Sequence, residues 1–191
     1  MWSPIVVETA PAAEPMTVEQ AKAHLRVYDD DSQDALIGNH IAAARAHVEQ
    51  VTGLRLYTQT LTLRCSEWAD LAHLPVAPIQ SVTVTYTDTA GATQTLSTAV
   101  YEERLYGLEP GLALKYQQAW PDIRPGSLIT VEADAGFGDD GDQEPAILQA
   151  MRLLIGDFFS FRETASTTAT SAIPTAGAVE ALLANHRFHL I

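Results

Sequence analysis

The residues best suited to chemistry are one acidic stretch and two pairs of histidines. Residues 139–144 read DDGDQE, and carboxylate oxygens are the ligands that hard cations prefer. The stretch lacks the alternate spacing and glycine placement of a calcium loop, so it is either a solvated turn or a weak cation site. His40 and His47 are seven residues apart and share one side of a helix, but zinc needs further ligands. The same holds for His186 and His189, so we predict no metal site.

Catalytic motifs are absent from the chain. It contains no G-x-S-x-G, G-x-x-x-x-G-K-[ST] or H-E-x-x-H pattern. Residues 136–138 (GFG) lack the third glycine of a dinucleotide fingerprint and predict a turn. Cys65 is the single cysteine, which excludes an intrachain disulfide, and its alternating neighbours favour a buried strand position over a reactive thiol. We therefore expect no catalytic residue, no cofactor and no enzyme activity.

The charge and hydropathy of the chain limit the classes of partner that it is expected to bind. Its 11 basic and 24 acidic residues give a net charge of −13, and duplex DNA is bound largely through Lys and Arg. Sequence-specific DNA binding is thus not expected, whereas an acidic surface suits a channel through which DNA slides. The longest apolar run in the second half is interrupted by polar side chains and is too short for a membrane span. The N-terminus does not resemble a signal peptide, so we expect a soluble protein made in the cytoplasm.

Caps and apolar periodicity predict several helices. Thr17 and Gln20 form a capping box before a short helix that ends near residue 27. A second helix should start at residue 31 or 32 and stop at Gly53. Pro145 suits the first turn of a third helix, which ends before a Ser/Thr/Ala tract at 164–171, and a last short helix is expected at 179–185. The apolar faces of the three longer helices comprise Val18, Ala21 and Leu25; Leu36, Ile37, Ile41, Ala44, Val48 and Val51; and Ile147, Met151, Leu154, Ile155, Phe158 and Phe161.

Between the second and third helices the apolar period changes from 3.6 to 2. Strands are expected at 60–65, 79–87, 93–96, 99–104, 112–116 and 127–135, with a turn at 88–91 joining a hairpin. The fold class is therefore α+β: a small helical bundle built from both chain ends, with an inserted, mainly antiparallel β-unit. We expect an N-terminal arm at 1–16, a helical core at 17–54 and 144–163, the β-unit at 55–136, and a flexible linker with a partner-binding segment at 164–191.

Several motifs, in this order, resemble the phage head–tail connector (adaptor) family, in particular its larger members with a β-insertion, as in long-tailed phages and gene-transfer agents. Each motif alone is weak, but their shared order and spacing cover residues 16–188. They are 17–27 (TVEQAKAHLRV), 29–37 (DDDSQDALI), 42–45 (AAAR), 48–49 (VE), 52–53 (TG), 74–75 (LP), 78–82 (PIQSV), 120–121 (WP), 135–138 (AGFG), 144–147 (EPAI), 158–163 (FFSFRE) and 179–183 (VEALL) with Arg187.

The resemblance implies a virion structural protein that catalyses no reaction. Members form a ring, typically of twelve subunits, beneath the portal and extend the DNA channel toward the stopper and tail. Genomic DNA then passes without specific binding, no membrane is involved, and the particle neck assembles in the bacterial host cytoplasm. Another neck or tail-completion ring protein is the alternative, and a metal-dependent enzyme is a third reading.

In this family a C-terminal segment commonly engages the portal, which corresponds here to the residues from the end of the third helix onward. The tail combines apolar side chains with an arginine, a pairing common at interface anchors. It either inserts into a partner or packs on the subunit's own core. The portal-binding residues expected from the resemblance are Arg162, Glu163, Leu182, Leu183, Arg187, Phe188, Leu190 and Ile191.

Overall fold

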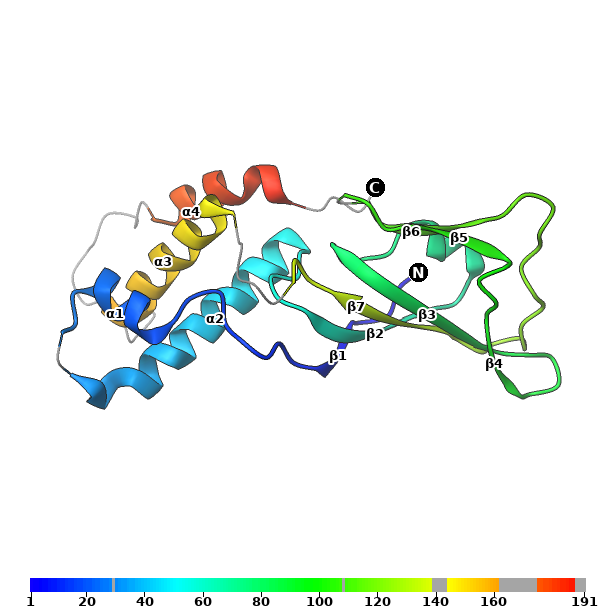
Figure 1. Ribbon diagram of the computed structural model, residues 1–191, viewed down its shortest axis with the longest axis horizontal. Coiled ribbons are helices and arrows are strands. Elements are labelled where there is room, and N and C mark those ends of the chain that lie inside the picture. Colours follow the sequence, from blue (N-terminus) through cyan, green and yellow to red (C-terminus); the bar gives the residue numbers. More distant parts are fainter. Residues whose placement is uncertain (29, 108, 139–143, 162–174, 188–191) are drawn as a thin grey trace.

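The computed structural model describes residues 1–28, 30–107, 109–138, 144–161 and 175–187. Four helices form one end of an elongated molecule and the strands form the other (Figure 1). The chain starts along the β-unit, forms the two N-terminal helices, crosses into the β-unit and returns to the helices, so helices from both halves of the sequence form the bundle. The predicted α+β class is confirmed.

The first helix begins at its predicted cap and the second ends at its predicted glycine. The second helix starts at Asp34 instead of the predicted 31 or 32, and its N-cap Gln33 makes no side-chain cap hydrogen bond. Helix α1 spans Val18–Leu25, and Thr17 and Gln20 form the capping box. A short 3-10 turn, Asp31–Gln33, leads into α2, Asp34–Thr52, which ends at Gly53 with a φ of 76°. The ammonium of Lys22 lies 2.8 Å from Asp31 and 2.9 Å from Asp34. Hydrogen bonds to these carboxylates, Asp31 first, raise the pKa of Lys22 above its usual value.

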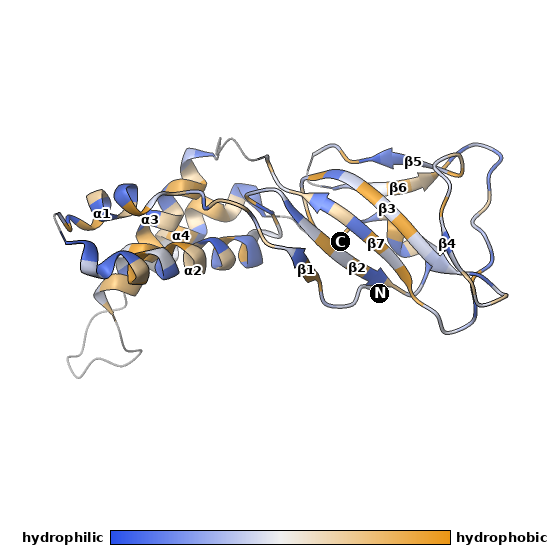
Figure 2. Ribbon diagram, turned by 60° about the horizontal axis from the view of Figure 1, so that its bottom comes forward, coloured by the Kyte–Doolittle hydropathy of each residue, from blue (hydrophilic) through white to orange (hydrophobic). Residues whose placement is uncertain are grey.

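The C-terminal helices pack against α2. Helix α3 spans Pro145–Ser160 with Pro145 in its first turn, and α4 spans Thr175–Leu183, earlier than the predicted 179–185. In Figure 2 the ribbon of α3 is largely apolar, which fits a helix that contacts α1, α2 and α4. The predicted faces supply most of the helical core, although Leu36 and Phe161 remain exposed. The buried core residues of this unit include Ala21, Ile37, Ile41, Ala44, Val48, Leu54, Leu56, Ile147, Ala150, Met151, Ile155, Val179 and Leu183.

The β-unit is built on a five-stranded sheet with the order β1-β2-β7-β3-β4. Its central strands are β2, Gln59–Cys65, β7, Ile129–Ala135, and β3, Ile79–Thr87, all paired antiparallel. Short β4, Thr93–Thr95, returns beside β3 as the predicted hairpin. Strands β5, Tyr101–Arg104, and β6, Gly111–Leu114, form a separate pair. Alternate residues of the central strands are buried, which explains the period of 2 in the sequence.

Strand β1 comes from the segment expected as an N-terminal arm. Val6–Thr9 pairs with β2 and forms one edge of the sheet. All four of its residues are exposed. The extended conformation was predicted, but the pairing with β2 was not.

Gly136 lies where the chain leaves the sheet for α3. Its φ is 141°, and a Cβ at this position would lie 2.3 Å from the backbone carbon and oxygen of Tyr57, which precedes β2. The amide of Gly136 donates to the carbonyl of Pro78 at 2.9 Å. The two connections between the helical unit and the β-unit therefore touch, and only glycine fits their contact.

Candidate functional site

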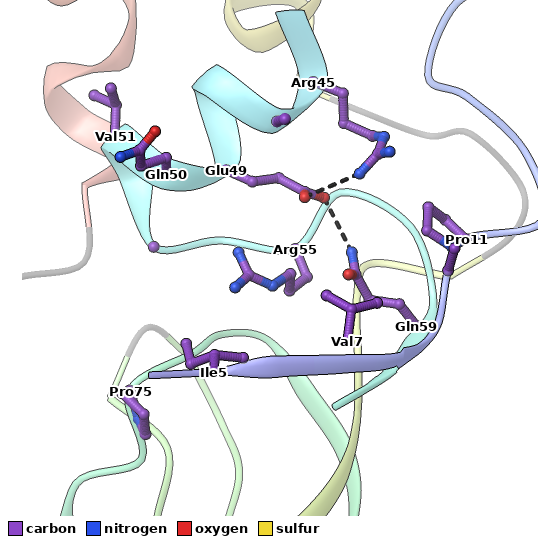
Figure 3. A pocket seen from close by; sticks show the side chains of 13 residues that line it. Ile5, Val7, Pro11, Arg45, Glu49, Gln50, Val51, Arg55, Gln59 and Pro75 are labelled. Atoms are coloured by element: carbon purple, nitrogen blue, oxygen red, sulfur yellow. Dashed lines mark hydrogen bonds and ion pairs between the residues drawn. The ribbon is translucent and has the colours of Figure 1, made fainter. Parts of the chain in front are cut away.

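A network of charged side chains joins the end of α2 to the start of the β-unit (Figure 3). Glu49 is buried on the last turns of α2, and its Oε1 accepts from the Leu56 amide at 3.0 Å and from Gln59 Nε2 at 3.1 Å. Its Oε2 accepts from Arg45 Nη1 at 3.1 Å. The carboxylate therefore fixes the direction in which the chain leaves the helix and enters β2.

Arg45 extends this network to the N-terminal segment. Its Nε donates to Glu14 Oε2 at 2.7 Å and its Nη2 donates to Glu14 Oε1 at 3.3 Å. Arg45 thus bridges two carboxylates, one on its own helix and one 31 residues earlier in the chain. A paired arrangement of this kind is required because a buried, unpaired charge is costly. Sequence reasoning missed the network, since only the i, i+4 spacing of Arg45 and Glu49 hinted at it.

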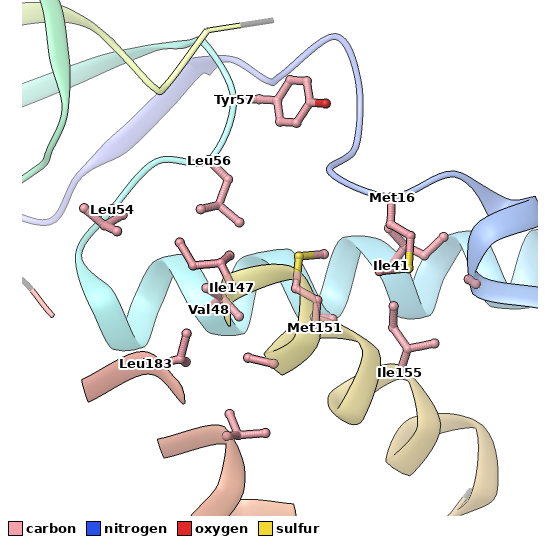
Figure 4. Packing of buried hydrophobic residues seen from close by; sticks show 14 of the residues in the cluster. Met16, Ile41, Val48, Leu54, Leu56, Tyr57, Ile147, Met151, Ile155 and Leu183 are labelled. Carbon is pink, nitrogen blue, oxygen red and sulfur yellow. The ribbon is translucent and has the colours of Figure 1, made fainter. Parts of the chain in front are cut away.

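The C-terminal helix α4 lies against the helical core (Figure 4). Val179 and Leu183 are buried in that core, and Leu182 is half-buried against it. Of the two predicted portal-binding leucines, Leu183 therefore offers no surface in this conformation and Leu182 offers part of its side chain. In this structure, the two leucines pack α4 against α3.

Arg187 follows α4 and is half-buried. Its Nη2 lies 3.9 Å from Glu180 Oε1, while its buried Nε has no hydrogen-bond partner among the described residues. The other predicted contacts, namely Arg162, Glu163, Phe188, Leu190 and Ile191, lie outside the described residues, as does the expected linker at 164–171. Of the eight predicted contacts, the structure therefore describes Leu182, Leu183 and Arg187.

The other candidate residues that the structure describes form no metal or catalytic site. In the described ranges no group of three His, Cys, Asp or Glu side chains could hold a metal, and residues 139–143 of the acidic stretch lie outside those ranges. The ring of His40 lies 6.0 Å from that of Phe158. Cys65 is buried in the sheet as predicted, and burial raises the pKa of its thiol to about 11. No helix among the described residues is long and apolar enough to cross a membrane.

An aromatic cluster in the β-unit also went unpredicted. The rings of Trp68 and Trp120 stack with centroids 5.1 Å apart, and Tyr86 meets Trp68 edge-on at 5.4 Å. The indole nitrogen of Trp68 donates to the carbonyl of Pro121 at 3.0 Å. These contacts join the 3-10 turn Trp68–Ala72, β3 and the loop before β7, so the cluster stabilises the sheet core.

A comparison with known protein families shows which class of protein this chain is similar to. Residues 15–105, which include α1, α2 and most of the β-unit, match the model of the family described as phage gp6-like head-tail connector protein. The resemblance to head–tail connector proteins that the ordered motifs predicted is thus confirmed. A search of curated proteins returned no match.

Solved structures share the fold along nearly the whole chain. A chain from the neck of an empty GTA particle, computed with C6 symmetry, has a TM-score of 0.81 at 23% identity and aligns over 99% of this chain and 97% of its own. A chain from the virion of a native gene transfer agent (GTA) particle has a TM-score of 0.78, with the same identity and coverage. A third, from the neck of a native GTA particle computed with C12 symmetry, has a TM-score of 0.72 at 23% identity and 97% coverage of both chains.

Proposed function

We propose that this chain is a structural head–tail connector subunit that forms a ring, of twelve copies, in the neck of a phage or gene-transfer particle. The ring lies beneath the portal and extends the DNA channel to the stopper and tail. The observation that carries the proposal is the match of residues 15–105 to a head–tail connector family. The shared fold with chains of GTA particles supports it over the rest of the length. No catalytic step is needed for this role.

The charge of the chain supports a passive channel. A net charge of −13 repels phosphates, so we propose that the inner wall of the ring is acidic and that DNA passes without specific binding. A ring structure whose channel-facing side chains were mainly Lys and Arg would contradict this. The particle neck, assembled in the host cytoplasm, is then the site of action.

The portal contact is proposed for the C-terminal segment, with the surface of Leu182 and Arg187 contributing. Arg187 fits this role because its half-buried guanidinium has a buried Nε with no partner among the described residues. Deleting the whole of 164–191 is a poor test, since it also removes Val179 and Leu183 from the core. A truncation after Arg187 leaves both in place. Loss of portal capture in a pull-down, with unchanged unfolding, is the expected result; full capture contradicts the assignment of residues 188–191 to the portal contact.

Electron microscopy of the purified full chain mixed with its portal protein tests the function directly. We expect a ring docked on the portal along its axis. Binding to the stopper but not to the portal would instead place the protein elsewhere in the neck, as a tail-completion or other ring protein. A chain that binds neither would refute the proposal.

A further inference from the structure

A cleft of about 570 Å³ opens between β1 and the last turns of α2. One wall is apolar and is formed by Ile5 and Val7 of the N-terminal segment, with Pro75 beside them (Figure 3). The opposite wall is the polar end of α2, with Arg55 following it. Strand β1 carries only β2 as a neighbour in the described sheet, and its residues are exposed. The cleft is therefore open on the outer edge of the sheet.

Arg55 has no acidic partner within the described chain. Among the described residues, the only hydrogen bond of its guanidinium runs from Nη1 to the carbonyl of Leu54 at 3.1 Å, and its buried Nε has no partner there. Burial lowers the pKa of Arg55, and the nearby Glu49 opposes this only in part. Glu49 forms no hydrogen bond with Arg55, because its carboxylate is directed instead to Arg45, Gln59 and the Leu56 amide. The Nη2 of Arg55 forms no hydrogen bond with a described residue, so it is the atom that can donate to a carboxylate entering the cleft.

We propose that this cleft binds a carboxylate-bearing segment of a second copy of the chain, and that the segment is Glu103 to Tyr106. The inference rests on the proposed ring, because a ring of identical subunits needs two different, complementary patches on each copy. The Arg55 cleft is one patch. The second must carry a free carboxylate on the other side of the subunit.

The residues around Glu103 meet these requirements. Glu103 on β5 is exposed and forms no ion pair with any described residue, whereas its neighbour Glu102 is paired with Arg104. Tyr106 is 92% exposed, a large apolar surface that the isolated subunit leaves in water. In both views β2, β7 and β3 lie between β1 and the pair of strands β5 and β6 (Figures 1 and 2). Glu103 would pair with Arg55, and the Tyr106 ring would cover Ile5, Val7 and Pro75.

The test is sedimentation velocity of the full-length chain over a concentration series, with Arg55→Met and Glu103→Gln. We expect each change to weaken self-association by roughly 30-fold, the effect of losing an interface anchor. The double variant should be no weaker than the weaker single variant, since both changes remove one contact. Additive losses would overturn the pairing.

Two controls separate the interface from folding. Arg55→Met should unfold at the same or higher urea concentration than the wild type, because it removes a buried, unpartnered charge. Arg64 is exposed on β2 without an ion pair among the described residues, so Arg64→Met should associate as the wild type does.

Each outcome has a distinct meaning. Wild-type association by Arg55→Met, or a wild-type chain that stays monomeric, overturns the inference. If the inference is overturned in one of these ways but the wild-type chain or the Arg55→Met variant still docks as a ring on the portal, the proposed function stands without this contact. If the wild-type chain neither self-associates nor binds the portal, both fail.

Discussion

Replacing Glu49 with alanine removes the acceptor that joins the end of α2 to the first residues of the β-unit. The side chain of Glu49 is only 7% exposed, so most of its contacts are with other protein atoms. Gln59, itself 3% exposed, would lose the carboxylate that accepts from its Nε2 at 3.1 Å. Arg45 would keep Glu14 at 2.7 Å, which limits the damage to one of its two ion pairs.

These contacts set the expected size of the effect. Leaving one buried amide donor unsatisfied costs about 1–3 kcal/mol, and losing a hydrogen bond to a charged group costs about 1.5–3 kcal/mol. Because Arg45 remains paired, we expect Glu49→Ala to lower the free energy of unfolding by about 2–4 kcal/mol, below the full cost of orphaning a buried charge. Glu49→Gln keeps an acceptor of the same shape and should cost about half as much.

Urea unfolding followed by circular dichroism measures both losses, provided that the slope with denaturant is unchanged. Glu8→Ala, at an exposed position of β1, is the matched control and should change stability by less than about 0.5 kcal/mol. A loss below about 1 kcal/mol for Glu49→Ala would refute the coupling role assigned to the carboxylate. Equal losses for alanine and glutamine would show that charge, not acceptor geometry, dominates.

Three further changes probe the core and the junction. Gly136→Ala should destabilise the protein by at least about 2 kcal/mol, because its Cβ meets the Tyr57 backbone at 2.3 Å; Gly38→Ala, in α2 with no atom within 4 Å of the added Cβ, should instead stabilise it by about 0.5–1 kcal/mol. The Cys65 thiol, with a pKa of about 11, is ionised in about one molecule per thousand at pH 8, so its reaction with a disulfide reagent should await unfolding; fast labelling of the native chain would contradict its burial. Leu183→Ala should cost about 2–5 kcal/mol in thermal or urea unfolding, and a neutral result would mean that α4 is not held by this side chain.

Local signals explain why most elements were predictable. The capping box at Thr17 and Gln20, Gly53 with its positive φ and Pro145 in a first turn act within a few residues, so their effect is visible in the sequence. The alternation of β2, β3 and β7 reflects one buried face of each strand. The order of these same elements also carried the family resemblance.

Pairing and charge complementarity were not predictable in the same way. Residues 6–9 have no strong alternation, and they form β1 only because the edge of β2 is available 51 or more residues later. The start of α4 at Thr175 was missed because residues 172–174 (AIP), directly before it, include no side chain of the type that caps a helix.

The sequence by itself determined an acidic α+β chain with helices from both ends, a β-insertion and the ordered motifs of a connector family, because caps, periods and composition are local properties. Only the tertiary structure decided that Glu49 and Arg45 bridge to Gln59 and Glu14, and that Leu183 belongs to the core. Only the tertiary structure also decided that Arg55 lines an open cleft and forms no ion pair with a described carboxylate. These facts depend on which distant side chains approach within hydrogen-bonding or van der Waals distance, and the folded packing alone sets those distances.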